Sequence, residues 1–183
     1  MSGGQERVSQ LPLDIAALRL RIRDIPDFPE PGIIFRDITP LLADAASFRA
    51  VVDAMAAPFS DIDLAVVIES RGFILGTPVA YALGAGVVPV RKAGRLPWNT
   101  LEEAYSLEYG ENVLEIHQDA IGPGARVLIV DDLLATGGTV AATVRLVQRL
   151  GGEIAGITVL AELAALNGRA ALAGQRLHSL VVY

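Results

Sequence analysis

The stretch VLIVDDLLATGGTV, residues 127–140, joins an aliphatic run, two adjacent acids and a series of small residues. The aliphatic run indicates a strand over 126–130 that is buried on both faces, with Asp131 and Asp132 directly after it. Ligands of open α/β sheets bind at the carboxyl ends of the strands. The stretch therefore predicts an α/β sheet with two carboxylates at its ligand-binding edge.

The small residues that follow, 135–139 (ATGGT), form a loop that leads into a helix predicted over 139–150. Such a loop lets backbone N–H groups approach an anion, and the N-terminus of a helix favours negative charge. Carboxylates repel phosphate, so Asp131 and Asp132 require a different target, for which sugar hydroxyls or Mg²⁺ with its waters are suitable. The whole stretch thus indicates a phosphorylated sugar as the ligand.

Short aliphatic runs and helical patterns alternate along the rest of the chain. Strands are predicted at 64–68, 87–90, 126–130, 154–160 and 177–182, and a hairpin at 105–109 and 112–116 with its turn at Gly110. Helices are predicted at 11–25, which Pro26 ends, at 48–59 with Ser47 as the N-cap, at 75–83 and at 139–150. This order predicts one α/β domain, residues 1–183, whose mostly parallel central sheet is flanked by helices, with residues 1–10 disordered.

Composition and charge exclude several classes of protein. With 15 Lys and Arg against 21 Asp and Glu, the net charge is −6, which argues against a nucleic-acid-binding surface. The absence of cysteine excludes disulfides, cysteine-based metal centres and a thiol nucleophile. His117 and His178 show no spacing typical of a metal or catalytic site, so neither is assigned a role. Glycine and proline interrupt the uncharged segment 73–90, so no membrane span is expected and the protein is predicted to be cytoplasmic.

Residues 127–139 resemble the phosphoribosyl pyrophosphate (PRPP) motif of the type I phosphoribosyltransferases. Five further segments resemble the adenine-specific branch of that family: FPEPGIIFRDITPLL (28–42), ESRGFILGTPVA (69–80), VRKAGRLPW (90–98), YSLEYG (105–110) and AELAALNGR (161–169). The resemblance implies the type I phosphoribosyltransferase fold, with a small N-terminal hood at 11–60, a PRPP-binding core at 61–183 and a mobile catalytic hairpin.

The resemblance also implies a reaction of purine salvage, in which the phosphoribosyl group of PRPP is transferred to adenine and AMP and pyrophosphate are formed. Breaking the bond to pyrophosphate places positive charge on the ribose and negative charge on the leaving group, so positioning and electrostatic stabilisation carry the catalysis. Mg²⁺ is implied as a cofactor that PRPP carries, without direct protein ligands but within reach of Asp131 and Asp132 through water. The expected partners are adenine, PRPP and a second copy of the chain, with no nucleic acid and no membrane.

The family pattern implies the candidate PRPP site residue by residue. It places the 5-phosphate at 135–139, the ribose hydroxyls at the two acids, and the pyrophosphate at a non-proline cis peptide between Glu69 and Ser70. The complete set of PRPP-binding candidates is Ser70, Arg71, Arg91, Lys92, Arg95, Tyr109, Asp131, Asp132, Ala135, Thr136, Gly137, Gly138 and Thr139. The chain departs from the pattern at Arg95, where many relatives have lysine, and at Ala93, where a basic residue is common.

The same pattern implies the residues that bind the base and assist the reaction. The adenine site would consist of the Ile34 carbonyl, the stacking ring of Phe35, the Arg36 N–H and Leu163 as the opposite wall. The catalytic candidates are Glu108, as general acid/base at the purine, with Arg71 and Asp131. Backbone recognition of the base discriminates well, because a wrong base would leave buried polar groups unpaired.

Other functions share the PRPP motif. A phosphoribosyltransferase for hypoxanthine, guanine, xanthine or orotate would keep it, although the segment PGIIFRD (31–37) favours adenine. A non-catalytic PRPP-sensing regulator would typically add a DNA-binding domain, but residues 1–60 show no helix-turn-helix pattern. A relative that binds PRPP without turnover is a third alternative, and the retention of Arg71, Glu108 and the acid pair argues against it.

Overall fold

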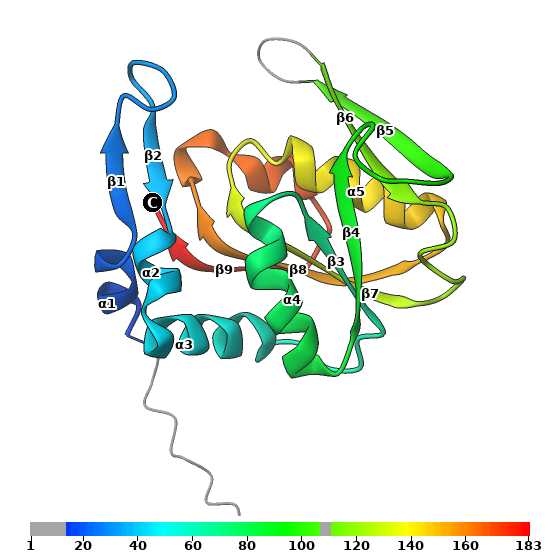
Figure 1. Ribbon diagram of the computed structural model, residues 1–183, viewed down its shortest axis with the longest axis horizontal. Helices are drawn as coiled ribbons and strands as arrows, with labels where there is room; N and C mark the ends of the chain where they lie inside the picture. The colour runs from blue at the N-terminus through cyan, green and yellow to red at the C-terminus, as the bar shows by residue number, and fades with distance from the viewer. Residues whose placement is uncertain (1–13, 107–110) are drawn as a thin grey trace, which may run out of the picture. The chain divides into compact units, whose positions relative to one another are not determined.

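The computed structural model describes residues 14–106 and 111–183. The chain divides into two compact units, residues 1–50 and 51–183, and each is described by itself (Figure 1). The expected disorder of residues 1–10 concerns a part of the chain outside the described residues.

The first unit contains short helices and a two-stranded sheet. Its elements are α1 (Ile15–Leu20), β1 (Arg23–Pro26), β2 (Ile34–Asp37), α2 (Thr39–Ala43) and the beginning of α3 (Ala45–Ala56). The single helix predicted over 11–25 is wrong in its second half, because Ile25 pairs with Phe35 in the antiparallel β1–β2 ladder. Pro26 ends a strand there, which its missing N–H permits at the end of a two-stranded sheet.

The predicted N-cap of the next helix is also wrong. Helix α3 begins at Ala45, two residues before Ser47. The Asp44 carboxylate accepts a hydrogen bond from the Ser47 N–H at 2.9 Å, so Asp44 supplies the capping oxygen. Both residue types cap helices well, and the sequence pattern alone did not distinguish them.

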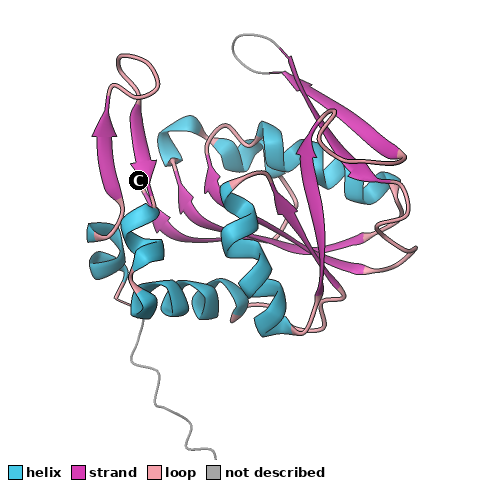
Figure 2. Cartoon of the chain, in the orientation of Figure 1, coloured by secondary structure: helices cyan, strands magenta, loops and turns pink. Residues whose placement is uncertain are grey.

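The second unit is built on one mixed sheet of seven strands (Figure 2), and their order is β5-β6-β4-β3-β7-β8-β9. The strands are β3 (Leu64–Ile68), β4 (Gly86–Lys92), β5 (Thr100–Ser106), β6 (Glu111–His117), β7 (Arg126–Leu134), β8 (Glu153–Glu162) and β9 (Leu177–Val182). The helices are α4 (Arg71–Leu83) and α5 (Gly138–Arg149), with 3-10 turns at Ala164–Leu166 and Gly168–Leu172. Five neighbouring strands, β4, β3, β7, β8 and β9, are parallel, which confirms the predicted mostly parallel sheet.

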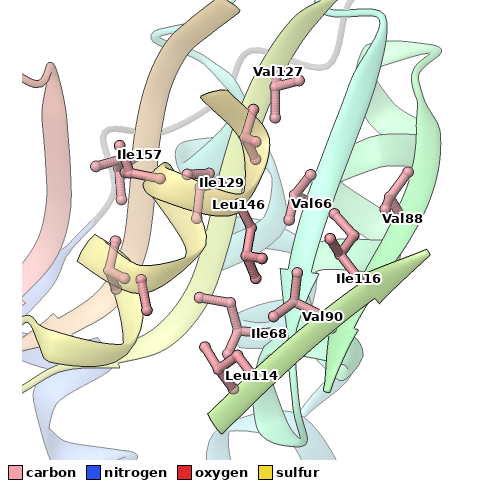
Figure 3. Packing of buried hydrophobic residues seen from close by; sticks show 14 of the residues in the cluster. Val66, Ile68, Val88, Val90, Leu114, Ile116, Val127, Ile129, Leu146 and Ile157 are labelled. Carbon is pink, nitrogen blue, oxygen red and sulfur yellow. The ribbon is translucent and has the colours of Figure 1, made fainter. Parts of the chain in front are cut away.

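The two helices lie on opposite faces of the sheet. The crossovers β3-α4-β4 and β7-α5-β8 run in opposite directions along the sheet, and right-handed crossovers then place their helices on opposite sides. Alternate residues of the central strands accordingly pack in two directions. Val66 and Ile129 join Leu146 of α5 in the main core cluster (Figure 3), whereas Val67 and Val130 face α4.

Several observed boundaries of strands and helices differ from the predicted ones. The strand expected to end at Val130 continues to Leu134, since β7 stays in register with β8 as far as the Leu134–Glu162 pair. Helix α4 begins at Arg71 rather than residue 75. The hairpin is confirmed as the antiparallel pair β5–β6, but its first strand starts at Thr100, and its turn lies outside the described residues.

We expect Gly76→Ala to destabilise the second unit, because its methyl group would lie 2.2 Å from Val67 Cγ1 and 3.3 Å from Val130 Cβ. Overpacking of this kind costs about 1–3 kcal/mol and outweighs the better helix propensity of alanine. Urea unfolding followed by circular dichroism measures the loss. Gly122→Ala is the control, since nothing lies within 4 Å of its added methyl group, and it should change stability by less than about 0.5 kcal/mol. Equal stability of the two variants would contradict the packing of α4 described here.

Candidate active site

The carboxyl ends of four neighbouring parallel strands, β4, β3, β7 and β8, form the edge that carries the predicted site (Figure 1). These ends carry Arg91 and Lys92 on β4, Glu69 to Arg71 after β3, Asp131 to Thr139 on and after β7, and Leu163 after β8. Residues that are up to 94 positions apart in the sequence (69 and 163) are therefore placed on adjacent strand ends.

The two acids of β7 are buried and lie beside Arg71. The Asp131 Oδ1 atom accepts a hydrogen bond from the backbone N–H of Asp132 at 2.8 Å. The Arg71 guanidinium, in the first turn of α4, forms an ion pair with the Asp132 carboxylate at 2.8 Å. Gly72 allows this approach, because a Cβ at that position would lie 2.9 Å from Asp131 Oδ1. The structure thus brings together the predicted ribose-binding acids and the predicted pyrophosphate-binding arginine.

Burial dominates the electrostatics of the acid pair. Desolvation raises the pKa of Asp131 well above its ordinary value, and the neighbouring charge of Asp132 raises it further. Desolvation also raises the pKa of Asp132, although the Arg71 charge opposes that shift. The ionised pair is therefore unfavourable by itself, and hydroxyl donors or a hydrated cation would stabilise it.

The loop 135–139 encloses a small hollow at the start of α5. The hollow has a volume of about 60 Å³ and is lined by Leu133, Leu134, Ala135, Thr136, Gly137, Gly138, Thr139 and Val140. The loop backbone packs closely against the 3-10 segment, since a Cβ on Gly168 would lie 2.3 Å from the Ala135 carbonyl oxygen. Gly137 precedes α5 with φ +84°, which an L side chain rarely adopts. The small residues therefore provide both the turn and the close packing.

A strand that the sequence did not associate with the loop contributes a hydroxyl to it. The Thr139 hydroxyl donates a hydrogen bond to the Tyr105 hydroxyl of β5 at 3.2 Å. On the same strand, Glu103 forms ion pairs with Arg145 and Arg149 of α5, at 2.5 and 2.7 Å. The sequence pattern gave Tyr105 no role, and its contact with Thr139 arises only from the packing of β5 beside α5.

The basic segment of β4 is held by the Glu69 side chain, for which the sequence predicted no role beyond the cis peptide. Both oxygens of the Glu69 carboxylate accept hydrogen bonds from Arg91, from Nη2 at 3.0 Å and from Nε at 3.3 Å. One of these oxygens also accepts the backbone N–H of Lys92 at 3.0 Å. The hydrogen bonds from Arg91 hold the pKa of Glu69 below its ordinary value despite its partial burial. The peptide between Glu69 and Ser70 is cis, as predicted.

The residues predicted for adenine belong to different units. Ile34, Phe35 and Arg36 lie on β2 of the first unit, where the Phe35 ring packs edge-on against Phe28 with 5.2 Å between ring centres. Leu163 follows β8 in the second unit, and its N–H donates to the Leu134 carbonyl oxygen at 2.9 Å. Their combination into one pocket stays a prediction.

The two histidines, to which the sequence pattern assigned no role, form no metal site among the described residues. Glu108 and Tyr109 lie outside the described residues. His117 Nε2 lies 2.6 Å from the Pro97 carbonyl oxygen, and His178 packs edge-on against Phe59 with its pKa lowered by burial. Within 14–106 and 111–183, no three His, Asp or Glu side chains gather in a metal-binding group. No helix of these ranges combines the length and the apolarity needed to cross a bilayer.

The fold and the site together define a class of protein. A parallel sheet whose edge presents a buried acid pair, a loop of small residues at a helix N-terminus and an arginine beside the acids has the architecture of the type I phosphoribosyltransferases. The family model of the phosphoribosyl transferase domain matches residues 40–172. The chain belongs to this family.

The relatives extend this similarity over nearly the whole chain. The chain is 56% identical to the adenine phosphoribosyltransferase of Anaeromyxobacter dehalogenans (strain 2CP-C) over 169 residues, which are 91% of this chain and 98% of the relative. It is also 56% identical to that of Thermotoga neapolitana over 168 residues, 91% of this chain and 99% of the relative. The crystal structure of the Rhodothermus marinus adenine phosphoribosyltransferase superposes with a TM-score of 0.89 at 52% identity, covering 92% of this chain and 98% of that one.

We expect Asp131→Asn to stabilise the protein in the absence of ligand. Burial raises the pKa of both carboxyls in the folded state, so their ionisation lowers stability as the pH rises from the ordinary aspartate pKa through the raised values. That loss is absent below the ordinary aspartate pKa of about 3.9. At pH 8 the melting temperature of Asp131→Asn should therefore exceed that of the wild type, by about 2–4 °C for each kcal/mol of stability gained. The difference in melting temperature should be smaller at pH 4. Asp132→Asn is the control, since it breaks the ion pair with Arg71. A melting temperature at pH 8 no higher than that of the wild type would contradict the electrostatic description of the pair.

Proposed function

We propose that this chain transfers the phosphoribosyl group of PRPP to adenine, forming AMP and pyrophosphate in purine salvage. The observation that carries the proposal is the set formed by Arg71, the buried acid pair and the hollow at 135–139, within a chain 56% identical to adenine phosphoribosyltransferases over 91% of its length. PRPP carries a phosphate, a ribose with free hydroxyls and a pyrophosphate. The strand ends offer a matching group for each of them.

We place the 5-phosphate of PRPP in the hollow at 135–139. The hollow lies at the N-terminus of a twelve-residue helix, and a helix N-terminus favours negative charge. The ribose hydroxyls then lie near Asp131 and Asp132, where each hydroxyl can donate to a carboxylate. Such donation favours the ionised form of these acids and offsets the desolvation that raises their pKa.

The pyrophosphate of PRPP belongs, in this proposal, to the ends of β3 and β4. Ser70 and Arg71 follow β3, while Arg91 and Lys92 end β4, the strand beside it. With Arg95 in the next loop, these side chains supply positive charge where the leaving group becomes more negative. The Glu69 carboxylate that holds Arg91 limits its rotation before pyrophosphate arrives. Less ordering is then required during the reaction.

Mg²⁺ completes the proposed site by neutralising the charge of pyrophosphate. Two adjacent carboxylates are too few oxygen ligands to bind this ion alone, because Mg²⁺ prefers octahedral coordination and keeps several waters. They suit a Mg²⁺ that arrives on PRPP, with Asp131 and Asp132 accepting hydrogen bonds from its waters.

For the base, we propose recognition by β2 from one side and Leu163 from the other. The Ile34 carbonyl would accept from the adenine amino group, the Arg36 N–H would donate to the ring, and Phe35 would stack on the base. We also propose Glu108 as the general acid/base at the purine, with Tyr109 beside it, although both lie outside the described residues.

We further propose that the protein acts in the cytoplasm as a homodimer. Ile74 and Tyr81, seven residues apart on one face of α4, are 48% and 86% exposed, and Val87 of β4 is 42% exposed. Exposed apolar side chains on one helix face, such as Ile74 and Tyr81, are typical of a surface that a partner covers.

We expect Tyr81→Glu to shift the protein to the mass of a single chain, because a carboxylate would be buried unpaired in the interface. Sedimentation equilibrium of wild type and variant measures the change. Leu166→Glu is the matched control, since Leu166 is a 48% exposed apolar residue of a 3-10 turn. A wild type that sediments as a monomer, or equal dimerisation of both variants, would exclude this interface.

The function is tested by supplying the purified protein with PRPP, Mg²⁺ and one base at a time: adenine, hypoxanthine, guanine, xanthine or orotate. We expect adenine to be converted to AMP, with turnover of each other base lower by at least about 100-fold, because a wrong base leaves buried polar groups unpaired. EDTA should abolish the reaction. Chromatography of the nucleotide product measures it.

Two outcomes would contradict the proposal in different ways. Preferential turnover of another base would retain the PRPP site but would reject the assignment of Ile34 to Arg36 and Leu163 as an adenine site. Binding of PRPP without turnover of any base would favour the PRPP-sensing regulator or a relative that binds PRPP without turnover.

A further inference from the structure

Glu115 is a buried acid that the proposed reaction does not use. It lies in the middle of β6, and only 2% of its surface is exposed. Its neighbours Leu114 and Ile116 belong to the main core cluster (Figure 3). Because side chains alternate along a strand, Glu115 points to the opposite face. A buried carboxylate is unfavourable unless hydrogen bonds satisfy it, so its partners indicate why it is tolerated there.

The partners of Glu115 are backbone groups of the loop that follows β4. Its Oε1 atom accepts the N–H groups of Arg95 and Leu96, each at 2.6 Å. The N–H of Gly94 and the side chain of Thr100 also form hydrogen bonds with the carboxylate. Burial by itself would raise the pKa of Glu115, but these hydrogen bonds outweigh it and the pKa is lowered, so the group is ionised at neutral pH. Three consecutive residues of the loop therefore wrap around one negative charge.

The same contacts fix the geometry of the basic residues on that loop. Arg91 lies directly opposite Glu115 in the β4–β6 register. Its Nη1 atom donates to the Arg95 carbonyl oxygen at 2.9 Å, while Nε and Nη2 donate to Glu69. Arg91 is thus held between the end of β3 and a turn whose shape depends on Glu115.

Among the described residues, the hydrogen-bond partners of Glu115 do not include the charged groups of the nearby arginines. Glu115 is satisfied by neutral backbone N–H groups and a hydroxyl, and none of its described hydrogen bonds comes from a guanidinium. A surface carboxylate near the same arginines would instead compete with a bound anion for them. The loop is therefore shaped by acceptor oxygens that do not occupy its arginines.

We propose that Glu115 is a positioning residue, which holds the 94–96 turn so that Arg91 and Arg95 are oriented toward the pyrophosphate group of PRPP. This inference rests on the proposed function, since it requires pyrophosphate to bind at the ends of β3 and β4. Glu115 acts through the loop backbone and does not touch the substrate.

The test compares three variants of Glu115 that separate the effect of side-chain length from the effect of its negative charge. Glu115→Gln keeps the length of the side chain and an acceptor oxygen but removes the charge. Glu115→Asp keeps the charge but withdraws the carboxylate by one methylene. Glu115→Ala removes both. Glu103→Ala is the matched control, because this acid of the neighbouring strand bonds Arg145 and Arg149 and has no hydrogen bond to the 94–96 turn among those of the described residues.

Titration calorimetry with magnesium pyrophosphate gives the dissociation constant, and steady-state kinetics give the KM values for PRPP and adenine. We expect Glu115→Asp and Glu115→Ala to weaken pyrophosphate binding and to raise the KM for PRPP by about tenfold or more, because three N–H groups lose their acceptor and the turn relaxes. Glu115→Gln should recover most of the affinity. The KM for adenine and the affinities of Glu103→Ala should stay within about threefold of the wild type.

The outcomes distinguish a failure of the role proposed for Glu115 from a failure of the proposed function. If the wild type binds neither magnesium pyrophosphate nor PRPP, the proposed function is wrong and the inference falls with it. If the wild type binds and the folded Glu115 variants bind equally well, the inference alone is wrong. It is also wrong if Glu115→Asp binds better than Glu115→Gln, since charge would then matter more than reach, or if PRPP and adenine are weakened equally. Should Glu115→Ala fail to fold, the comparison of Gln with Asp decides.

Discussion

The site depends on the difference in length between two neighbouring strands. Strand β7 pairs with β3 only as far as the Val67–Val130 register, but it pairs with β8 on its other side as far as Leu134. The extra segment of β7 therefore has β8 along one edge and the start of α4 along the other. Asp131 and Asp132 lie in this segment, which is why they are buried and why Arg71 and Gly72 can reach them. A β7 that ended with β3 would leave both acids in a solvated turn.

Charge at this edge is arranged in ion pairs. Arg71 is held by Asp132 and Arg91 by Glu69, while Glu115 holds the adjoining loop through its backbone. Groups oriented before the ligand arrives require little reorganisation when charge develops on a leaving group. The arrangement lowers stability where acids are buried beside each other, as the raised pKa values of the acid pair indicate. Such a loss of stability is common where a site is built for function.

The candidate site was largely predictable because its residues are grouped in short segments. The stretch at 127–140 indicated the strand, the acids and the loop from residue type alone, and the resemblance added Ser70, Arg71 and the basic segment. The sequence did not indicate the partners that hold these residues. Gly168 is 29 residues beyond the end of the 135–139 loop, and Tyr105 is 34 residues before Thr139, so no local pattern connects them. Glu115 lies among alternating residues of a hairpin strand and is indistinguishable there from a solvated carboxylate.

The sequence by itself determined the α/β class, the order of most strands and helices, and the position of the small-residue loop at 135–139. Those properties follow from local periodicity and from short runs of residue types that act within one turn or one strand. Only the tertiary structure decided the length of β7, the burial of the acid pair and the contacts of Glu69, Tyr105 and Glu115. These depend on which strands become neighbours and how far their pairing continues, and strand pairing joins residues that are distant along the chain.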